Sequence, residues 1–253
     1  REVEALSGRI ETIASSVQRQ APAAAEAARE VVPGAIDLSD VPGGAADTRD
    51  AFMNAYYHNF YLSDVVAEKQ SVYIPYLRGP GAAGRVLDLG CGRGELLRNL
   101  ADCGIEATGV DHNAPFVEGI RMSGLDADHA DVLAFLGETT ERFGAITALQ
   151  LIEHLEWPHF CELVQRSFDV LLPGGRLILE TINPGVDNAF ASFHMDPTHE
   201  RPLPPALVQF TCEWFGFSEC RFLYQNPVGP VVDGGEPHRT YHDYALIADK
   251  PGD

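Results

Sequence analysis

From residue 85 onward, short apolar runs alternate with amphipathic segments of helical period. The runs predict strands and the segments between them predict helices. Such alternation, with right-handed crossovers, is typical of a parallel, doubly wound α/β sheet. The expected strands cover residues 85–89, 107–110, 126–130, 145–149 and 176–181, and the expected helices cover residues 95–103, 114–123, 132–142 and about 158–171.

The C-terminal part of the chain predicts one more helix, over residues 205–215, and two closing strands, over residues 219–224 and 241–248. Joined as a hairpin, these strands complete a mostly parallel sheet of seven strands.

The first 20 residues carry apolar side chains at alternating spacings of three and four. This a/d seam predicts an amphipathic, coiled-coil helix over residues 1–20 and with it a partner chain or a homo-oligomer; a single helix lying on its own domain is the alternative. Residues 21–47 are rich in Ala, Pro and Gly and are interpreted as a linker, which leaves residues 48–253 as the main domain. The seam consists of Val3, Leu6, Ile10, Ile13 and Val17.

Aromatic side chains mark a second helical region that begins near Asp47 or Thr48, two residue types that cap helices. Packing explains most of them, but a helix directly before a ligand-binding domain often folds over the ligand. Residues 48–78 are therefore predicted as a helical lid. The aromatic residues at helical spacing are Phe52, Tyr56, Tyr57, Phe60 and Tyr61.

The charge of the chain is strongly acidic: 18 Lys and Arg stand against 37 Asp and Glu, a formal net charge of −19. Such a field repels phosphate backbones, so no nucleic-acid partner is expected, although high solubility alone also explains the charge. Five cysteines without a C-x-x-C pair favour a reduced, cytoplasmic compartment. No apolar run approaches the roughly 18 residues of a membrane span. The chain begins at Arg1, which leaves open whether it is part of a longer protein.

A glycine-rich turn is the clearest ligand-binding signal: Asp88-Leu89-Gly90-Cys91-Gly92-Arg93-Gly94 follows the first strand and opens a helix. Glycines there let the backbone approach a ligand, and the helix N-terminus faces it. Dinucleotide enzymes carry a similar turn, but Asp88 would repel a pyrophosphate. A carboxylate suits the ammonium of an amino-acid cofactor, which favours S-adenosylmethionine (SAM) over NAD.

Two further acids follow the next strands. Asp111 ends the second strand, where a carboxylate can accept both hydroxyls of a ribose, and Asp131 follows the third. Asp131 can accept from an adenine amino group while the Val132 N–H donates to the ring. Taken singly, each acid is more often a helix cap or a solvated charge than a ligand group, but all three stand at the carboxyl ends of successive strands.

These motifs, with Leu172-Pro173-Gly174-Gly175-Arg176-Leu177, resemble those of class I SAM-dependent methyltransferases, whose fold is a Rossmann-like sheet. The resemblance covers roughly residues 73–248. It implies that SAM is the cofactor and S-adenosylhomocysteine the product. The residues that it assigns to the cofactor are Asp88, Gly90, Gly92, Arg93, Asp111, His112, Asp131, Val132 and Gln150.

A narrower resemblance lies in three segments downstream of the cofactor motifs. They are similar to bacterial methyltransferases found with glycosyltransferases in surface-polysaccharide assembly, some of which carry coiled coils. The expected acceptor is therefore a glycan or another small molecule. The segments are Glu153-His154-Leu155, Glu180-Thr181-Ile182-Asn183-Pro184 and residues 196–205.

Methylation of a hydroxyl requires a base within hydrogen-bond reach, because a neutral hydroxyl is a poor nucleophile. His154 and His199 follow strands four and five and are the candidates, and Asp196 is expected to orient His199 or to bind a sugar hydroxyl. No residue is assigned to a metal. A divalent ion held by members of this region stays an alternative, with Glu153, His154, His194, Asp196 and His199 as its donors.

The sequence thus predicts a SAM-dependent O-methyltransferase acting on a sugar or a glycosylated acceptor. Three alternatives stay open. They are a methyltransferase for another natural-product hydroxyl or amine, a non-catalytic SAM-binding scaffold and a nicotinamide oxidoreductase.

Overall fold

The structure is a computed structural model that describes residues 55–57, 60–79, 83–228 and 239–252. It divides into two compact units, residues 1–62 and residues 63–253. The predicted coiled-coil helix and linker lie outside the described residues. Within the first unit, Tyr56 stacks on Phe60 with ring centroids 4.8 Å apart, and Tyr57 contacts Tyr61 at 5.5 Å.

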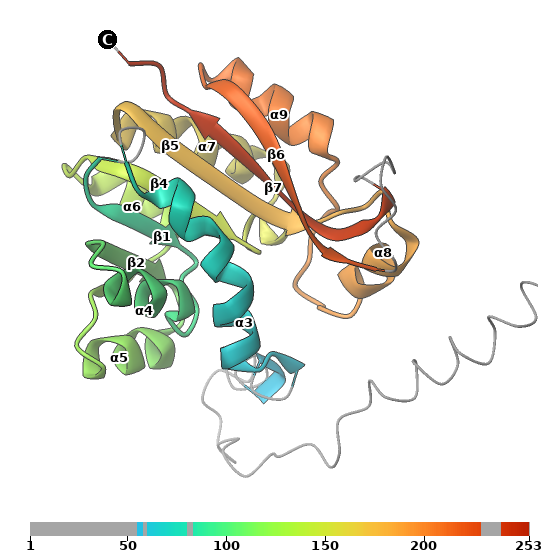
Figure 1. The fold of residues 1–253 in the computed structure, drawn as a ribbon, viewed down its shortest axis with the longest axis horizontal. Helices are drawn as coiled ribbons and strands as arrows, with labels where there is room; N and C mark the ends of the chain where they lie inside the picture. The colour runs from blue at the N-terminus through green and yellow to red at the C-terminus, as the bar shows by residue number, and fades with distance from the viewer. Residues whose placement is uncertain (1–54, 58–59, 80–82, 229–238, 253) are drawn as a thin grey trace, which may run out of the picture. The chain divides into compact units, whose positions relative to one another are not determined.

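A seven-stranded sheet in the order β3-β2-β1-β4-β5-β7-β6 forms the centre of the second unit (Figure 1). The first five strands pair in parallel, and β7 lies antiparallel between β5 and β6. The predicted seven-stranded, mostly parallel sheet with a closing hairpin is therefore confirmed. The strands are Val86–Leu89 (β1), Ala107–Asp111 (β2), Ala127–His129 (β3), Phe143–Leu149 (β4), Leu171–Ile182 (β5), Ser218–Pro227 (β6) and Tyr241–Asp249 (β7).

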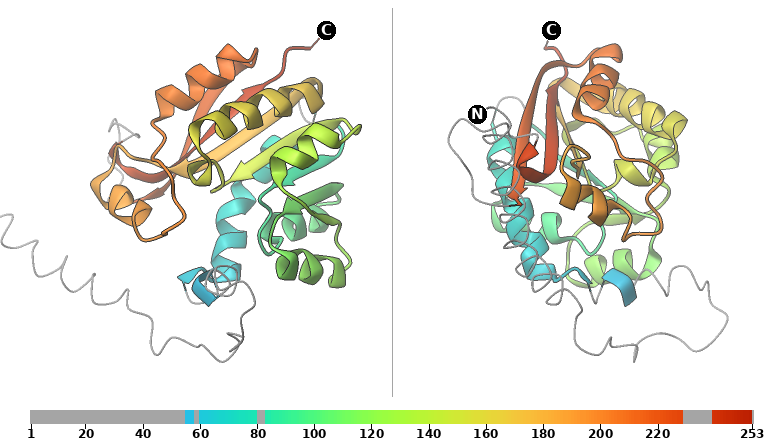
Figure 2. Two further views of the ribbon diagram at one scale, coloured as in Figure 1. Left: turned by 180° about the vertical axis from the view of Figure 1, so that it is seen from behind. Right: turned by 90° about the vertical axis from the view of Figure 1, so that its right-hand side faces the viewer.

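Helices cover both faces of this sheet, so the doubly wound arrangement is also confirmed (Figure 2). Side chains alternate along a strand, and β1 shows the two faces: Leu87 and Leu89 pack into one apolar cluster and Val86 into the other. The helices and 3₁₀ segments are Ser63–Gln70 (α3), Ser71–Leu77 (η1), Glu95–Asp102 (α4), Ala114–Met122 (α5), Val132–Glu138 (α6), Ile152–His154 (η3), Trp157–Val170 (α7), Asp187–Phe193 (α8) and Pro205–Trp214 (α9).

Local chemistry explains where the helices that follow the strands begin. Asn113 Oδ1 accepts from Phe116 N at the start of α5, and Asp131 Oδ1 accepts from Leu133 N and Ala134 N at the start of α6. Pro158 and Pro205 stand in the first turns of α7 and α9, where a missing N–H costs nothing. α5 and α6 therefore start directly beyond the ends of β2 and β3, which brings these two loops together at one edge of the sheet.

The structure differs from the expected elements in three places. α6 ends at Glu138 instead of residue 142, because the β-branched Thr139 takes an extended conformation. β5 begins at Leu171 instead of at residue 176 as expected. The short helix α8, which follows β5, was not among the expected elements.

α3 and η1 lie on the α4 side of the sheet and carry the described part of the predicted lid that belongs to the second unit. Asn99 Nδ2 donates to Ala67 O at 2.7 Å, and Arg176 Nη1 donates to Tyr76 O at 2.8 Å. Tyr73 is fully buried. Its ring fixes this segment against the core, and Pro75 lies inside η1. In the part of the chain that the structure describes, no helix is long and apolar enough to cross a membrane.

Two glycines provide a matched test of the packing between the sheet and α4. A Cβ on Gly109 would lie 2.5 Å from Cys91 Sγ, whereas a Cβ on Gly119 in α5 would meet nothing within 4 Å. We expect Gly109→Ala to destabilise the fold by about 1–3 kcal/mol through overpacking. Gly119→Ala should stabilise it by about 0.5–1 kcal/mol, because alanine is the better helix former. Urea unfolding measures the free energy of unfolding of both variants. Equal changes in the two variants would contradict the β2–α4 packing.

Candidate functional site

The turn between β1 and α4 places backbone at the carboxyl edge of the sheet. Gly90, Gly92 and Gly94 have φ of 67°, 53° and 77°, a left-handed conformation that favours glycine. A Cβ on Gly90 would lie 2.9 Å from the Leu151 side chain. At Gly92 it would meet nothing within 4 Å, so the turn is open on that side. The turn therefore leaves backbone accessible on that side, and its contact with a ligand stays a prediction.

The carboxylate of Asp111 holds this turn against the end of β2. Its Oδ2 accepts from Gly92 N and its Oδ1 from Asn113 N, both at 2.8 Å. Burial raises the pKa of Asp111, and these two backbone N–H groups oppose the rise. A carboxylate oxygen has two acceptor directions, so each oxygen can still accept from a ligand hydroxyl.

Asp88 lies buried on β1, directly behind the glycine turn. Thr147 Oγ1 on the neighbouring β4 donates to its Oδ1 at 2.6 Å. Burial raises the pKa of Asp88 to about 7, the Thr147 hydroxyl opposes this, and the charges of Asp111 and Glu95 add to it. A buried carboxylate among like charges favours a cationic ligand, because a cation compensates the cost of its ionised form.

Three residues assigned to the adenine, Asp131, Val132 and His112, follow β2 and β3 at the carboxyl edge of the sheet. Asp131 is exposed and caps α6, and Val132 beside it is buried. His112 is exposed, with Nδ1 3.7 Å from Asp111 Oδ1, and its carbonyl lies 2.9 Å from His129 Nε2. The expected contacts of Asp131, Val132 and His112 with an adenine stay predictions.

The two remaining residues assigned to the cofactor are positioned by acids. Arg93 Nε donates to Glu95 Oε1 at 2.8 Å, in the first turn of α4. Gln150, after β4, has φ of 53°, and its Nε2 donates to Glu180 Oε1 at 2.8 Å. Both side chains flank the glycine turn and the end of β4, and their contacts with a cofactor stay predictions.

A chain of hydrogen bonds orients His154, which ends η3. Its Nδ1 lies 2.8 Å from Thr198 Oγ1, and that hydroxyl donates to Asp196 Oδ1 at 2.6 Å. A hydroxyl has one hydrogen, so Thr198 accepts from the Nδ1–H of His154. The tautomer leaves Nε2 as an acceptor. Asp196 therefore orients His154 through Thr198. One of the two roles expected for Asp196 was to orient His199 instead.

His199 is held separately, by the loop that follows α8. Its Nδ1 lies 2.6 Å from Phe193 O, and a carbonyl only accepts, so Nδ1 carries the hydrogen. The rings of His154 and His199 meet edge to face with centroids 4.5 Å apart. Burial, and after it the charge of His199, lowers the pKa of His154 to about 4, while Asp196 opposes the fall. The structure thus pairs two imidazoles whose Nε2 atoms are acceptors.

Glu153 is the third member of the cluster that contains His154 and His199. It is fully buried, and among the described residues neither carboxylate oxygen has a hydrogen-bond partner. Burial raises the pKa of Glu153 to about 8. A backbone hydrogen bond and the Thr181 hydroxyl oppose the rise, and the charges of Glu180 and Asp243 add to it. Ligand atoms of Glu153, His154 and His199 all lie within 4.8 Å of one another. His194 and Asp196, the other two donors of the alternative metal site, do not belong to this group.

A second polar network, which the sequence did not indicate, joins β5 to β7. Tyr73 Oη donates to the Glu180 carboxylate, Gln225 Nε2 donates to Glu180 Oε2 at 3.2 Å, and Gln150 Nε2 lies 3.4 Å from Asp243 Oδ1. Burial raises the pKa of Glu180 to about 7, with the charge of Asp243 as the next cause.

Two residues that organise the site were missed, Thr147 and Thr198. Thr198 carried a readable signal, because an Asp two positions before it forms an Asx turn: Thr198 N donates to Asp196 Oδ1 at 2.8 Å. Thr147 lies inside an apolar strand and carried none, since only the register of β1 against β4 places it opposite Asp88.

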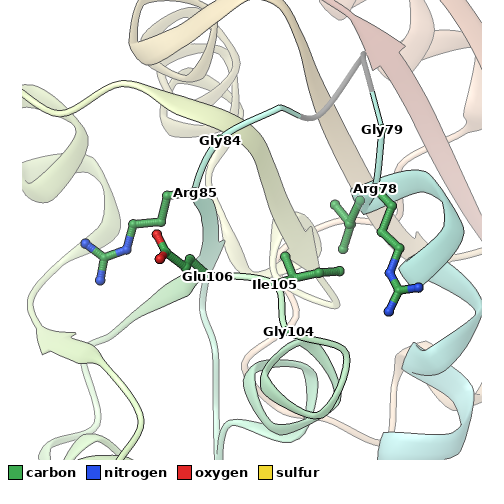
Figure 3. Close-up of a pocket in the computed structure, with 8 residues that line it drawn as sticks. Arg78, Gly79, Gly84, Arg85, Gly104, Ile105 and Glu106 are labelled. Atoms are coloured by element: carbon green, nitrogen blue, oxygen red, sulfur yellow. The ribbon is translucent and has the colours of Figure 1, made fainter.

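An open hollow of about 440 Å³ lies elsewhere, at the opposite edge of the sheet (Figure 3). Arg85 and Glu106, which line it, directly precede β1 and β2, whereas the glycine turn follows β1. Ligands of open α/β sheets bind beyond the carboxyl ends of the strands. The hollow is therefore separate from the candidate site.

Comparison with known proteins places the chain among methyltransferases. A family model described as a methyltransferase domain matches residues 53–207. Ubiquinone biosynthesis O-methyltransferases of Xanthomonas oryzae pv. oryzae and Stutzerimonas stutzeri are 33% and 31% identical over 108 residues. These matches cover 40% of this chain and 44% and 46% of the relatives, so the chain matches less than half of their length.

Solved structures share the fold at low sequence identity. A SAM-dependent methyltransferase from Archaeoglobus fulgidus superposes with a TM-score of 0.70 at 24% identity, over 79% of this chain and 100% of that one. A possible histamine N-methyltransferase from Thermotoga maritima gives 0.61 at 15%, over 79% and 97%. A glycopeptide N-methyltransferase solved with SAM gives 0.52 at 18%, over 73% and 94%.

The raised pKa of Asp88 predicts how stability depends on pH. The folded chain binds this proton more tightly than the unfolded chain, so the contribution of Asp88 to stability falls as pH rises from about 4 to 7. Its slope is at most about 1.4 kcal/mol per pH unit. We expect Asp88→Asn to lose this component, so that the variant declines less than the wild type between pH 5 and 8.

Urea unfolding across that pH range measures the difference, and carboxylates common to both proteins cancel in it. Asp102→Asn, at an exposed position at the end of α4, is the matched control. Parallel wild-type and Asp88→Asn curves would show that Asp88 is ionised in the fold at no cost.

Proposed function

The chain belongs to the class I SAM-dependent methyltransferases, and from that premise we propose that it transfers the methyl group of SAM to a hydroxyl oxygen of a sugar or a glycosylated acceptor. The observation that carries the proposal is the histidine pair at the carboxyl edge of the sheet. His154 and His199 each have an Nδ1 that is hydrogen-bonded and an Nε2 that is left to act on an acceptor.

The acids along this edge are proposed to bind the parts of SAM in strand order. Asp88 receives the ammonium, while Gly90 and Gly92 lie against the methionine chain. Asp111 accepts the ribose hydroxyls with the oxygens that already hold Gly92 and Asn113.

The adenine follows at the ends of β2 and β3. Asp131 accepts from its amino group, the Val132 N–H donates to the ring, and His112 lies against it. Arg93 and Gln150 border the methionine end, each fixed by a buried glutamate.

Transfer is an in-line displacement that the cofactor has already activated, because its sulfur is positively charged. In the simplest form the acceptor hydroxyl gives its proton to Nε2 of His154 or His199. The oxygen bonds to the methyl carbon as the carbon–sulfur bond breaks, and the sulfur keeps the electron pair in S-adenosylhomocysteine. Asp196 and Thr198 act as positioning residues for His154.

Oxygen is supported as the methylated atom by the relatives that are named O-methyltransferases. A sugar is supported by the resemblance to methyltransferases of surface-polysaccharide assembly. The buried carboxylates and the net charge of −19 disfavour an acidic acceptor.

Another natural-product hydroxyl or amine is the second candidate, favoured by the fold shared with a glycopeptide N-methyltransferase. Mass spectrometry and NMR of the methylated product separate the two by identifying the modified atom. A non-catalytic scaffold would bind SAM and methylate none of the acceptors screened.

Asp111→Ala should weaken SAM binding by about 1–3 kcal/mol, or roughly 5- to 150-fold, because charge-assisted hydrogen bonds are lost and the glycine turn loses its anchor. Calorimetric titration measures the affinity. Asp102→Ala, at an exposed acid at the end of α4, should bind as the wild type does. Unchanged affinity in Asp111→Ala would reject the ribose assignment.

His154→Ala and His199→Ala should leave SAM affinity unchanged and lower turnover by about 10²- to 10⁴-fold. His159→Ala, an exposed histidine on α7, is the control and should turn over normally. Turnover is followed as S-adenosylhomocysteine release with the identified acceptor. Wild-type rates in both site variants would remove the histidine pair from the mechanism.

A further inference from the structure

We propose that Glu153, His154 and His199 form a binding site for one divalent first-row transition cation of the Zn²⁺ type. The three side chains supply one carboxylate oxygen and two imidazole nitrogens, and these atoms lie within 4.8 Å of one another. Two histidines and one carboxylate are a donor set used for such cations.

Glu153 is the observation that points to a ligand. Its side chain is fully buried, and among the described residues neither oxygen makes a hydrogen bond of ordinary geometry. The Thr181 hydroxyl lies close enough to lower the pKa of Glu153, but a buried carboxylate ordinarily accepts well-formed hydrogen bonds. Glu180 and Asp243 add like charge nearby. A cation would compensate the charge of Glu153 and occupy its acceptor oxygens.

Both histidines are already oriented as metal ligands usually are. A ligating imidazole donates its second ring N–H to a carbonyl, a carboxylate or a group bonded to one. His199 donates from Nδ1 to Phe193 O, and His154 donates from Nδ1 to Thr198, which is bonded to Asp196. On each ring, Nε2 is therefore the nitrogen that can bind a cation.

The backbone joins the two segments that supply the donors. Glu200 N donates to Glu153 O at 2.8 Å, which ties the loop carrying His199 to η3. Ligand bonds of about 2.0–2.2 Å require the donor atoms to close in by small rotations. The half-buried imidazole rings allow such rotations, and buried Glu153 sets the position.

The donors also select the kind of cation. Imidazole nitrogens favour Zn²⁺ and its neighbours, whereas Mg²⁺ prefers an all-oxygen octahedron. Three protein ligands leave a fourth position for a water or a substrate oxygen, as in catalytic zinc sites.

The catalytic consequence rests on the proposed function. With the cation bound, the acceptor hydroxyl takes the fourth position, its pKa falls, and its proton passes to a water molecule instead of to a histidine. The oxygen then bonds to the methyl carbon, the carbon–sulfur bond breaks and the sulfur keeps the electron pair.

The binding site is tested with Co²⁺ on the untagged full chain, stripped with a chelator, without cofactor or acceptor. We expect one Co²⁺ per chain with the visible absorption of a tetrahedral N/O site, displaced by Zn²⁺. Glu153→Gln and His199→Ala should weaken binding at least 10-fold. Glu156→Gln and His159→Ala, both exposed neighbours on the same segment, should bind as the wild type does.

Circular dichroism checks that the variants are folded, and if Glu153→Gln is not, His199→Ala decides. Wild-type binding no tighter than that of the site variants would overturn the inference. SAM titration and turnover in chelator are measured separately. Turnover that survives chelation, with no Co²⁺ bound, would leave the proposed function standing and reject the cation. Binding of Co²⁺ without methylation of any acceptor would support the cation site and reject the proposed function.

Discussion

The hydrogen bond from the Gly92 amide to the Asp111 carboxylate is the constraint on which the rest of the site depends. It joins the turn after β1 to the end of β2, and the left-handed glycines allow the turn to take the shape that the bond requires. β1 lies between β2 and β4, and its register against β4 places Asp88, directly before the turn, opposite Thr147. A parallel sheet thereby gathers residues from distant parts of the sequence along one edge.

Buried carboxyl groups cluster along the carboxyl edge of the sheet. Asp88, Glu153 and Glu180 are all buried, and the pKa of each lies well above its ordinary value. A fold keeps such groups at a cost in stability where they serve a ligand, so their clustering is typical of a functional site. The arrangement divides in two: carboxylates at the glycine turn suit a cationic cofactor, and Glu153 with the two histidines suits an acceptor, either directly or through a metal ion.

The sequence predicted what is local. The glycine turn, Asp111 and the cap residue Asp131 each follow from the order strand, turn, helix, and the hairpin at the end of the sheet follows from spacing alone. It could not predict which side chains meet across long separations. His154 and Thr198 are 44 positions apart, and their bond depends on the path of the loop after α8, so Asp196 was paired with the wrong histidine in one expectation. The network around Tyr73 and Glu180 has the same origin, since it spans 107 positions.

A crystal structure of the chain with S-adenosylhomocysteine tests the central claim most directly, because it locates the amine, the ribose and the adenine at once. The account predicts the amine within hydrogen-bond distance of Asp88 and both ribose hydroxyls on Asp111, with the glycine turn unchanged. A nucleoside lying away from that turn, or bound in the hollow beside Arg85 and Glu106, would contradict it.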